Sequence, residues 1–266
     1  MSLNDRTDDL LSRNGELTRL PLPGSPLQRR PEKISEVVAR AIARDIATQG
    51  LPPGAILPPV SEMLQRYRVG RAALREGLRI LELHGLITVK PGPSGGAIVA
   101  ETSSQDFGRM STLHYQAIGA TFEDLLEARM FIEPLMAAMA AREQDGELLS
   151  QLRHVADCTR AGMRNDLEYG FYSTEFHAVL ANASGNRVLG LFTRSLKDVY
   201  SERVPGAPFP VEERQRVVRD HDAILKAIDS GNSRGAERLM RGHMQRVADF
   251  VSERFPGALD EVVRWH

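Results

Sequence analysis

The chain has 266 residues, of which 42% are hydrophobic and 26% charged, and its formal net charge of −1 leaves no overall electrostatic bias. No apolar run approaches the roughly 20 residues that span a bilayer. The N-terminus also lacks the apolar core of a secretion signal, so we expect a cytoplasmic protein without membrane partners. Cys158 is the only cysteine, which excludes an intrachain disulfide.

The chain opens with a segment that shows no helical or strand period. Residues 1–30 include the turn-rich stretch LPLPGSPLQRRP and are predicted to form a flexible N-terminal tail. Order is predicted to begin near Pro31, with a helix that ends before Gly50 because glycine interrupts helices. A short helix over residues 59–67 follows.

A third helix is predicted from Gly70 to His84, and it leads directly into a hairpin. Its apolar face consists of leucines at helical spacing: Leu74, Leu78 and Leu81. From Ile87 to Val99, two β-branched runs flank the turn KPGPSGG, which predicts two short strands around a glycine-rich tip. Residues 31–100 are therefore predicted to form three helices and a wing.

The start of the third helix carries two arginines that suit nucleic acid. Arg71 and Arg75 lie four residues apart and so share one helical face. In a helix-turn-helix unit the start of the second helix reaches base edges in the major groove, and the arginine fork matches guanine and phosphate oxygens. Residues 28–100 carry 11 Lys and Arg against 6 Asp and Glu, whereas residues 101–266 carry 20 against 25. A basic face that is merely solvated is the alternative.

The stretch GAILPPVSEMLQRYRVGRAALREGLRILELHGLITVKPGPSGGAIV has a Leu-Pro start, an Arg-Glu-x-Leu helix and a Gly-Leu-Ile strand. In these features residues 31–100 resemble the winged helix-turn-helix DNA-binding domain of GntR-type transcription regulators. The resemblance implies that Arg71 and Arg75 contact the major groove and that Gly92 lies in the wing beside the minor groove. Three positions that usually carry Arg, Ser or Thr in the family differ here: Ser61, Gly70 and Ala72.

Residues 101–266 show long helical patterns and no convincing strand. Helices are predicted at about 103–118, 121–143, 146–164, 166–182, 186–204, 210–230 and 232–255. Thr121 and Asn232 fit helix starts, because short polar side chains there accept hydrogen bonds from free backbone N–H groups. The predicted fold is mainly α, with the winged helix-turn-helix followed by an all-α bundle of about six or seven helices.

Three histidines lie on separate helices of this bundle: His177, His221 and His243. Each extends an apolar stripe at i, i+3 or i+4 spacing, so all three are predicted to point inward. A single histidine of this kind is usually a core residue whose nitrogens are hydrogen-bonded. Three imidazoles that converge would instead suit a divalent transition metal such as zinc or nickel. Both interpretations stay open on the residues alone.

The stretches ATFEDLLEARMFIEPLMAAMAA, EFHAVLANASGN and RDHDAILKAIDSGN resemble the helical ligand-binding (FCD) domain in the FadR-type branch of the GntR family. In its metal-binding members an Asp and a His four apart, with two further His, hold a metal that binds a carboxylate effector. The resemblance implies that His177, His221 and His243 are ligands, whereas Ser173 stands at the Asp position. Either three histidines suffice, with water or effector completing the site, or the pocket works without metal.

Arg129 and Glu133 lie four residues apart and match recurring family positions at the edge of the pocket. An arginine there could clamp an effector carboxylate, and Asn186 could donate a hydrogen bond to it. With Ser173, Arg129 and Asn186 are the candidate effector-binding residues. The alternative for Arg129 and Glu133 is an ion pair that orients their helix.

These features predict a cytoplasmic, homodimeric transcription regulator, most often a repressor in this family, whose affinity for an inverted-repeat DNA operator depends on a small carboxylate metabolite. Residues 101–266 would bind the ligand and dimerise. One alternative is a DNA-binding dimer without an effector. A three-histidine metal hydrolase is the other, but no general base is positioned near the histidines, so we predict that the protein is not an enzyme.

Overall fold

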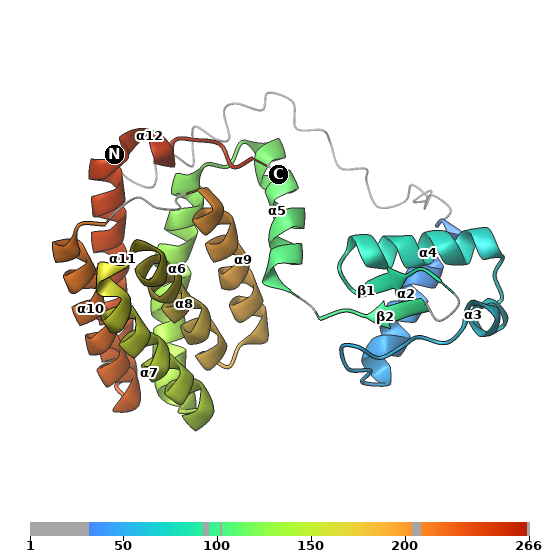
Figure 1. Ribbon diagram of the computed structural model, residues 1–266, viewed down its shortest axis with the longest axis horizontal. Helices are drawn as coiled ribbons and strands as arrows, with labels where there is room; N and C mark the ends of the chain where they lie inside the picture. Colours follow the sequence, from blue (N-terminus) through green and yellow to red (C-terminus); the bar gives the residue numbers. More distant parts are fainter. Residues whose placement is uncertain (1–31, 93–95, 102, 204–208, 265–266) are drawn as a thin grey trace, which may run out of the picture.

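The computed structural model describes residues 32–92, 96–101, 103–203 and 209–264. The predicted tail over residues 1–30 and hairpin residues 93–95 lie outside the described residues. Two separate hydrophobic clusters form in the described part, one from residues between Val38 and Val99 and one from residues between Phe122 and Val263. Figure 1 shows the helices and strands that carry them. None of the helices in the described ranges is long and apolar enough to cross a membrane.

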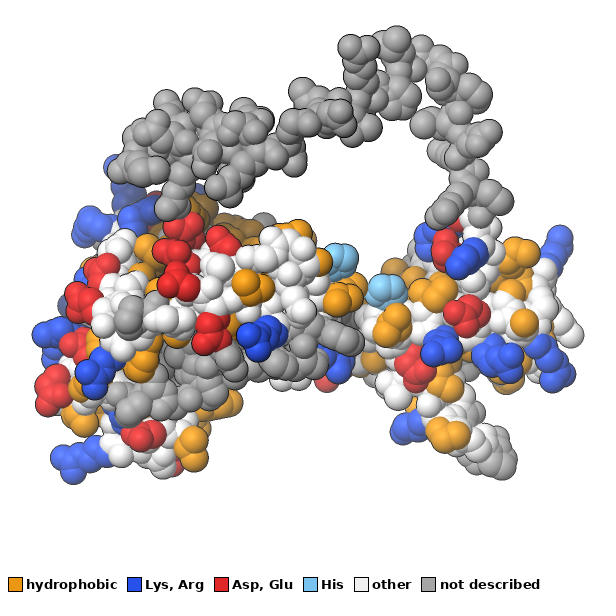
Figure 2. Space-filling view, turned by 90° about the horizontal axis from the view of Figure 1, so that it is seen from above, with side chains coloured by type: hydrophobic (Ala, Val, Ile, Leu, Met, Phe, Trp, Pro, Cys, Tyr) orange, Lys and Arg blue, Asp and Glu red, His pale blue; other side chains and the backbone are white. Residues whose placement is uncertain are grey.

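The N-terminal unit has three helices and a two-stranded wing, as predicted. Its elements are α2 (Ile34–Thr48), α3 (Val60–Tyr67), α4 (Arg71–Leu83), β1 (Ile87–Lys90) and β2 (Gly96–Val99). The strands pair antiparallel, with Ile87 opposite Val99 and Lys90 opposite Gly96. Lys and Arg side chains are spread over the surface of this unit (Figure 2). The winged helix-turn-helix prediction is therefore confirmed.

Close approach of two helices fixes the position of α4. Its buried leucines pack against α2: Leu74, Leu78 and Leu81. On the same face, a Cβ added to Gly77 would come within 3.1 Å of the Ser35 carbonyl oxygen and of Val38. Any side chain at this position would therefore require α2 and α4 to move apart by at least a few tenths of an ångström. Gly85 follows α4 with a φ of +69°, a conformation that glycine adopts readily, and so ends the helix.

The C-terminal unit is entirely helical in its described part, which confirms the predicted bundle. Its elements are α5 (Ser104–Ile118), α6 (Phe122–Glu143), α7 (Gly146–Ala161), the 3₁₀ turn Gly162–Arg164, α8 (Asp166–Ala183), α9 (Arg187–Arg203), α10 (Val211–Asp229), α11 (Ser233–Arg254) and α12 (Pro256–Leu259). Thr121 and Asn232 cap α6 and α11 as predicted. The short α12 was not predicted, because four residues cannot show a helical period.

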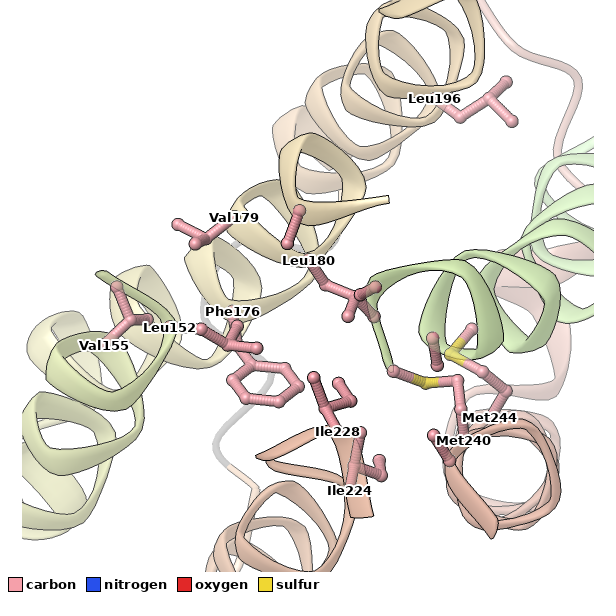
Figure 3. Packing of buried hydrophobic residues seen from close by; sticks show 14 of the residues in the cluster. Leu152, Val155, Phe176, Val179, Leu180, Leu196, Ile224, Ile228, Met240 and Met244 are labelled. Atoms are coloured by element: carbon pink, nitrogen blue, oxygen red, sulfur yellow. The ribbon is translucent and has the colours of Figure 1, made fainter. Parts of the chain in front are cut away.

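The bundle core lies where α6, α7, α8, α10 and α11 meet. Helix α6 packs along α11 and also contacts α8, α9 and α10. Side chains from three of these helices point toward one another and are almost completely buried (Figure 3): Phe176, Leu180, Ile224, Ile228, Met240 and Met244. Helices α8, α10 and α11, which carry the three candidate histidines, are therefore held together by dense apolar packing.

The close contact between α2 and α4 can be tested by measuring the stability of glycine variants. Replacing Gly77 with valine should lower the free energy of unfolding by about 1–3 kcal/mol, because the new side chain must force the two helices apart. Gly170→Ala is the control, since this exposed α8 glycine has no atom within 4 Å of an added Cβ. It should raise stability by about 0.4–1 kcal/mol. Denaturant unfolding followed by circular dichroism measures both, and a neutral Gly77→Val would contradict the close approach.

Candidate functional site

The exposed face of α4 carries the two arginines predicted to contact DNA. Arg71 is the first residue of α4 and Arg75 lies one turn later; both are exposed, whereas Leu74 between them is buried. Gly92 is exposed just after β1, with a φ of +112°. The structure thus places all three residues on the surface of the N-terminal unit, and their contacts with DNA stay a prediction.

Two further arginines enlarge this basic face. Arg79 is exposed one turn beyond Arg75, so the spacing of four residues continues along α4. Arg79 was not among the residues predicted to contact DNA, although its spacing of four from Arg75 indicates the same face. Arg68 is exposed in the turn between α3 and α4, where its φ is +51°. The three positions that depart from the family pattern are exposed as well and add no charge: Ser61, Gly70 and Ala72.

The three candidate histidines converge inside the bundle. His177 on α8 is 6% exposed, and His221 on α10 and His243 on α11 are each 1% exposed. One ring nitrogen from each lies within 4.8 Å of the other two. The ring centroids of His221 and His243 are 4.8 Å apart, and that of His177 lies 5.3 Å from His243. All three side chains therefore point inward, as predicted.

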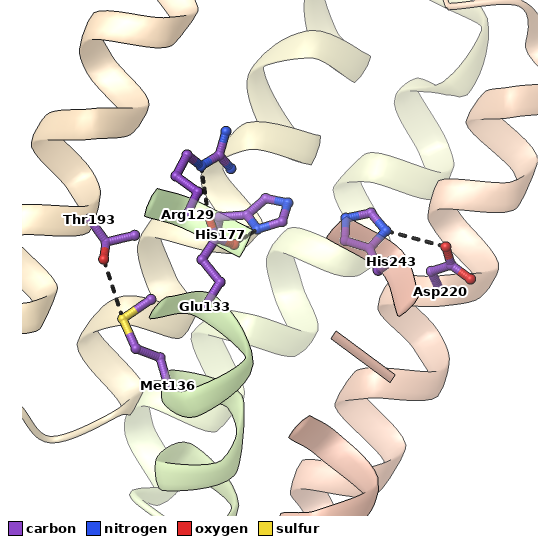
Figure 4. A network of polar contacts seen from close by, with 7 residues as sticks. All are labelled: Arg129, Glu133, Met136, His177, Thr193, Asp220 and His243. Carbon is purple, nitrogen blue, oxygen red and sulfur yellow. Dashed lines mark hydrogen bonds and ion pairs between the residues drawn. The ribbon is translucent and has the colours of Figure 1, made fainter. Parts of the chain in front are cut away.

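A buried carboxylate from α6 contacts the first histidine. Oε2 of Glu133 lies at hydrogen-bond distance from Nδ1 of His177, while Oε1 accepts from Nε of Arg129 at 2.7 Å (Figure 4). Glu133 is completely buried and Arg129 is 6% exposed. Burial raises the pKa of Glu133, but Arg129 and His177 lower it by more. The pKa therefore falls from its ordinary value to about 2. The ion pair that the sequence suggested thus exists, is buried, and leads into the histidine cluster.

A second carboxylate contacts His243 in a similar way. Oδ2 of Asp220 lies 3.2 Å from Nδ1 of His243, and both Asp220 oxygens bind Arg246, at 3.0 and 2.7 Å (Figure 4 shows the His243 contact). Hydrogen bonds from His243 and Arg246 lower the pKa of Asp220, although its partial burial acts in the opposite direction. Neither Asp220 nor Arg246 was singled out from the sequence, since only the folded helices bring them beside His243.

His221 differs from both neighbours. Neither of its ring nitrogens has a hydrogen-bond partner among the described residues. Its ring stacks on Phe176, with centroids 3.9 Å apart and planes 9° from parallel. Burial, and then the nearby His243 and His177, hold the pKa of His221 well below its ordinary value, so the ring is neutral. An unpartnered buried imidazole is costly, because each buried polar atom without a hydrogen bond loses its interaction with water.

This donor set fits a transition-metal ion. With Nδ1 of His177 and His243 occupied by carboxylates, Nε2 of each ring is the nitrogen left for a metal. His221 offers a neutral nitrogen without competing partners. Nitrogens that share one zinc or nickel ion lie about 3–4 Å apart, given metal–nitrogen bonds of about 2.1 Å. The observed span of up to 4.8 Å requires the side chains to close in by about 1 Å.

The remaining candidate residues lie around this cluster with other partners. Ser173 is half-buried one helical turn before His177 and bonds Tyr169. Glu175, two positions before His177, pairs with Lys197 of α9 at 3.5 Å. The side-chain oxygen of Asn186 accepts hydrogen bonds from the backbone N–H groups of Val188 and Leu189 and so caps α9. Its role toward an effector stays a prediction.

Two known families match the chain in these same regions. Residues 34–95 match the bacterial regulatory proteins of the gntR family, and residues 124–246 match the FCD domain. The HTH-type transcriptional repressor NanR of Cronobacter sakazakii is 29% identical over 238 residues, covering 84% of this chain and 88% of that protein. An uncharacterized HTH-type transcriptional regulator of Mycobacterium tuberculosis is 28% identical over 224 residues, covering 82% and 89%.

A solved structure shares the fold over most of the chain. It is Streptococcus agalactiae GntR, with a TM-score of 0.64 and 23% sequence identity, covering 81% of this chain and 99% of that one. The matched families and relatives are transcription regulators and not enzymes, which rules out the metal-hydrolase alternative. This chain belongs to the GntR family of DNA-binding transcription regulators and carries an FCD domain after its winged helix-turn-helix.

Proposed function

We propose that this regulator binds a small carboxylate metabolite beside a divalent transition-metal ion, zinc or nickel, held by His177, His221 and His243. Metabolite binding changes the affinity of the N-terminal unit for an operator. The protein acts as a cytoplasmic repressor of the FadR-type branch and binds DNA as a homodimer. The likeness to proteins named repressors supports the sign of regulation, and the histidine geometry supports the metal.

The observation that carries this proposal is the state of His221. Neither nitrogen of its fully buried imidazole has a hydrogen-bond partner in the part of the chain that the structure describes, and the ring stacks on Phe176 and faces two further imidazoles. Such a ring destabilises the bundle unless something binds there. A metal ion supplies the missing partner for one nitrogen, and a neutral ring is the form that can bind it. The alternative is a histidine that only fills the core, and such a residue would have a hydrogen-bond partner.

The effector completes the site in this proposal. Three imidazoles leave coordination positions open on a zinc or nickel ion, and a carboxylate oxygen suits them. We assign Arg129, Ser173 and Asn186 to the effector, with Glu133 holding the Arg129 side chain in place. A DNA-binding dimer without an effector remains the second candidate, favoured by the absence of a carboxylate at position 173.

The arrangement of α4 supports the DNA-binding mode. The exposed arginines of α4 would enter the major groove. Gly92 in the wing would approach the minor groove, where the backbone can come close to the sugar-phosphate chain. A two-fold dimer reads two half-sites, so the operator is expected to be an inverted repeat.

The first prediction from this proposal concerns operator affinity. Arg71→Ala and Arg75→Ala should each weaken binding by about 1–3 kcal/mol while leaving the fold intact, because each removes a base or phosphate contact. Fluorescence anisotropy with a labelled operator measures the effect, and circular dichroism checks the fold. Arg216→Ala, an exposed arginine on α10, is the control and should bind normally. Unchanged affinity in both α4 variants would remove the recognition-helix assignment.

The second prediction concerns metal content. Elemental analysis and calorimetric titration should find one zinc or nickel ion per chain in the wild type and none in His221→Ala, with the surface variant His114→Ala unaffected. Ser173→Asp should raise metal affinity, because it adds a charged ligand one turn from His177. Acetate, succinate or citrate should bind more tightly with metal present, and metal more tightly with the carboxylate, as linkage requires. Normal metal content in His221→Ala would contradict the site.

The third prediction concerns metal-free stability. His221→Leu should raise the free energy of unfolding by about 1–3 kcal/mol near pH 7, because it removes unpartnered buried nitrogens. In the wild type the folded-state pKa of His221 is depressed, so the unfolded chain binds a proton that the folded chain does not. Stability should therefore fall as pH drops below about 6.5, the unfolded value. His221→Leu should show a shallower fall in urea denaturation between pH 7 and pH 5.5, whereas His114→Leu should match the wild type.

A further inference from the structure

Two similar chains of contacts lead from the outside of the histidine cluster inward. In one, Arg129 of α6 binds Glu133, which contacts Nδ1 of His177. In the other, Arg246 of α11 binds Asp220 of α10, which contacts Nδ1 of His243. Each series of contacts leads from an arginine through a carboxylate to an imidazole. The third histidine has no such chain among the described residues, because both nitrogens of His221 lack partners there.

We propose that Glu133 and Asp220 are positioning residues that hold His177 and His243 with the proton on Nδ1 and the lone pair on Nε2, and that Glu133 supplies the negative charge that position 173 does not. This inference rests on the proposed metal centre and adds how the centre is tuned.

The tautomer follows from simple donor and acceptor accounting. An ionised carboxylate only accepts hydrogen bonds, so a neutral imidazole beside it must place its proton on the contacting nitrogen. Both contacts are made by Nδ1. In the neutral form of each ring, which is the form that can bind a metal, the lone pair is therefore on Nε2. A carboxylate that accepts from a ligating histidine also makes that ring a stronger electron donor to a metal.

The two carboxylates differ in burial, and therefore in how strongly their charges act on the ion. Glu133 is completely buried, so its charge acts across a medium with little screening, whereas the Asp220 side chain is 21% exposed and its partner Arg246 is 52% exposed. Arg129 keeps the buried Glu133 charge from being isolated, since a carboxylate without a partner would take up a proton instead. Glu133 therefore has the larger influence on the ion, and Asp220 mainly orients its ring.

The experiment combines a metal-free and a metal-bound readout on the full-length protein. In chelator-treated protein labelled with ¹⁵N-histidine, two-bond ¹H–¹⁵N spectra should show His177 and His243 as Nδ1-protonated tautomers. In zinc titrations, Glu133→Gln should bind about 10- to 100-fold more weakly, and Asp220→Asn should lose less. Glu175→Gln is the matched control, because this acidic residue lies two positions from His177 but pairs with Lys197.

A rescue variant separates charge from folding. Adding Ser173→Asp to Glu133→Gln should recover at least tenfold of the lost zinc affinity, because a negative charge then lies near the ion again. A variant that binds weakly only because it misfolds would not recover, and its thermal unfolding would show this. Nε2-protonated rings at His177 and His243, or a Glu133→Gln variant that binds zinc like the wild type, would overturn the inference while leaving the metal centre in place. A wild type that binds no zinc would overturn the metal centre, and the tautomer measurement would still decide the arrangement of protons.

Discussion

The burial of three imidazole rings where α8, α10 and α11 meet is the constraint around which the C-terminal unit is arranged. Polar rings in an apolar interior destabilise it unless each finds a partner. His177 finds Glu133 and His243 finds Asp220, and each carboxylate in turn is held by an arginine. His221 alone rests on the ring of Phe176. The surrounding leucine, isoleucine and methionine side chains supply the stability that this polar centre does not.

The two units of the chain meet at the end of the recognition helix. Helix α5 begins directly after the wing, and Asp106 in its first turn lies against Gly85, where a Cβ would come within 2.7 Å of the carboxylate. Farther along, α5 packs against α9, where Gly108 lies beside the backbone of Ser195. Helix α5 thus contacts both the DNA-binding unit and the bundle.

Charge is divided between the units in a way that suits their separate partners. The excess of Lys and Arg in residues 28–100 favours a phosphate backbone, while the acidic balance of residues 101–266 does not. Inside the bundle, Arg129 and Arg246 offset part of the negative charge of the carboxylates nearest the histidines. This balance of charge favours the proposed binding of an anionic metabolite beside a metal ion.

The helices, the wing and the inward orientation of His177, His221 and His243 could be predicted from local patterns, because periodic apolar spacing and capping residues such as Thr121 are local signals. What those histidines contact depends on how the helices pack in three dimensions. Glu133 and Asp220 lie 44 and 23 residues from the rings they contact, and no local spacing reports which face of one helix packs against another. The orphaned nitrogens of His221 were equally hidden, since a missing partner is defined only once every neighbouring helix has been placed.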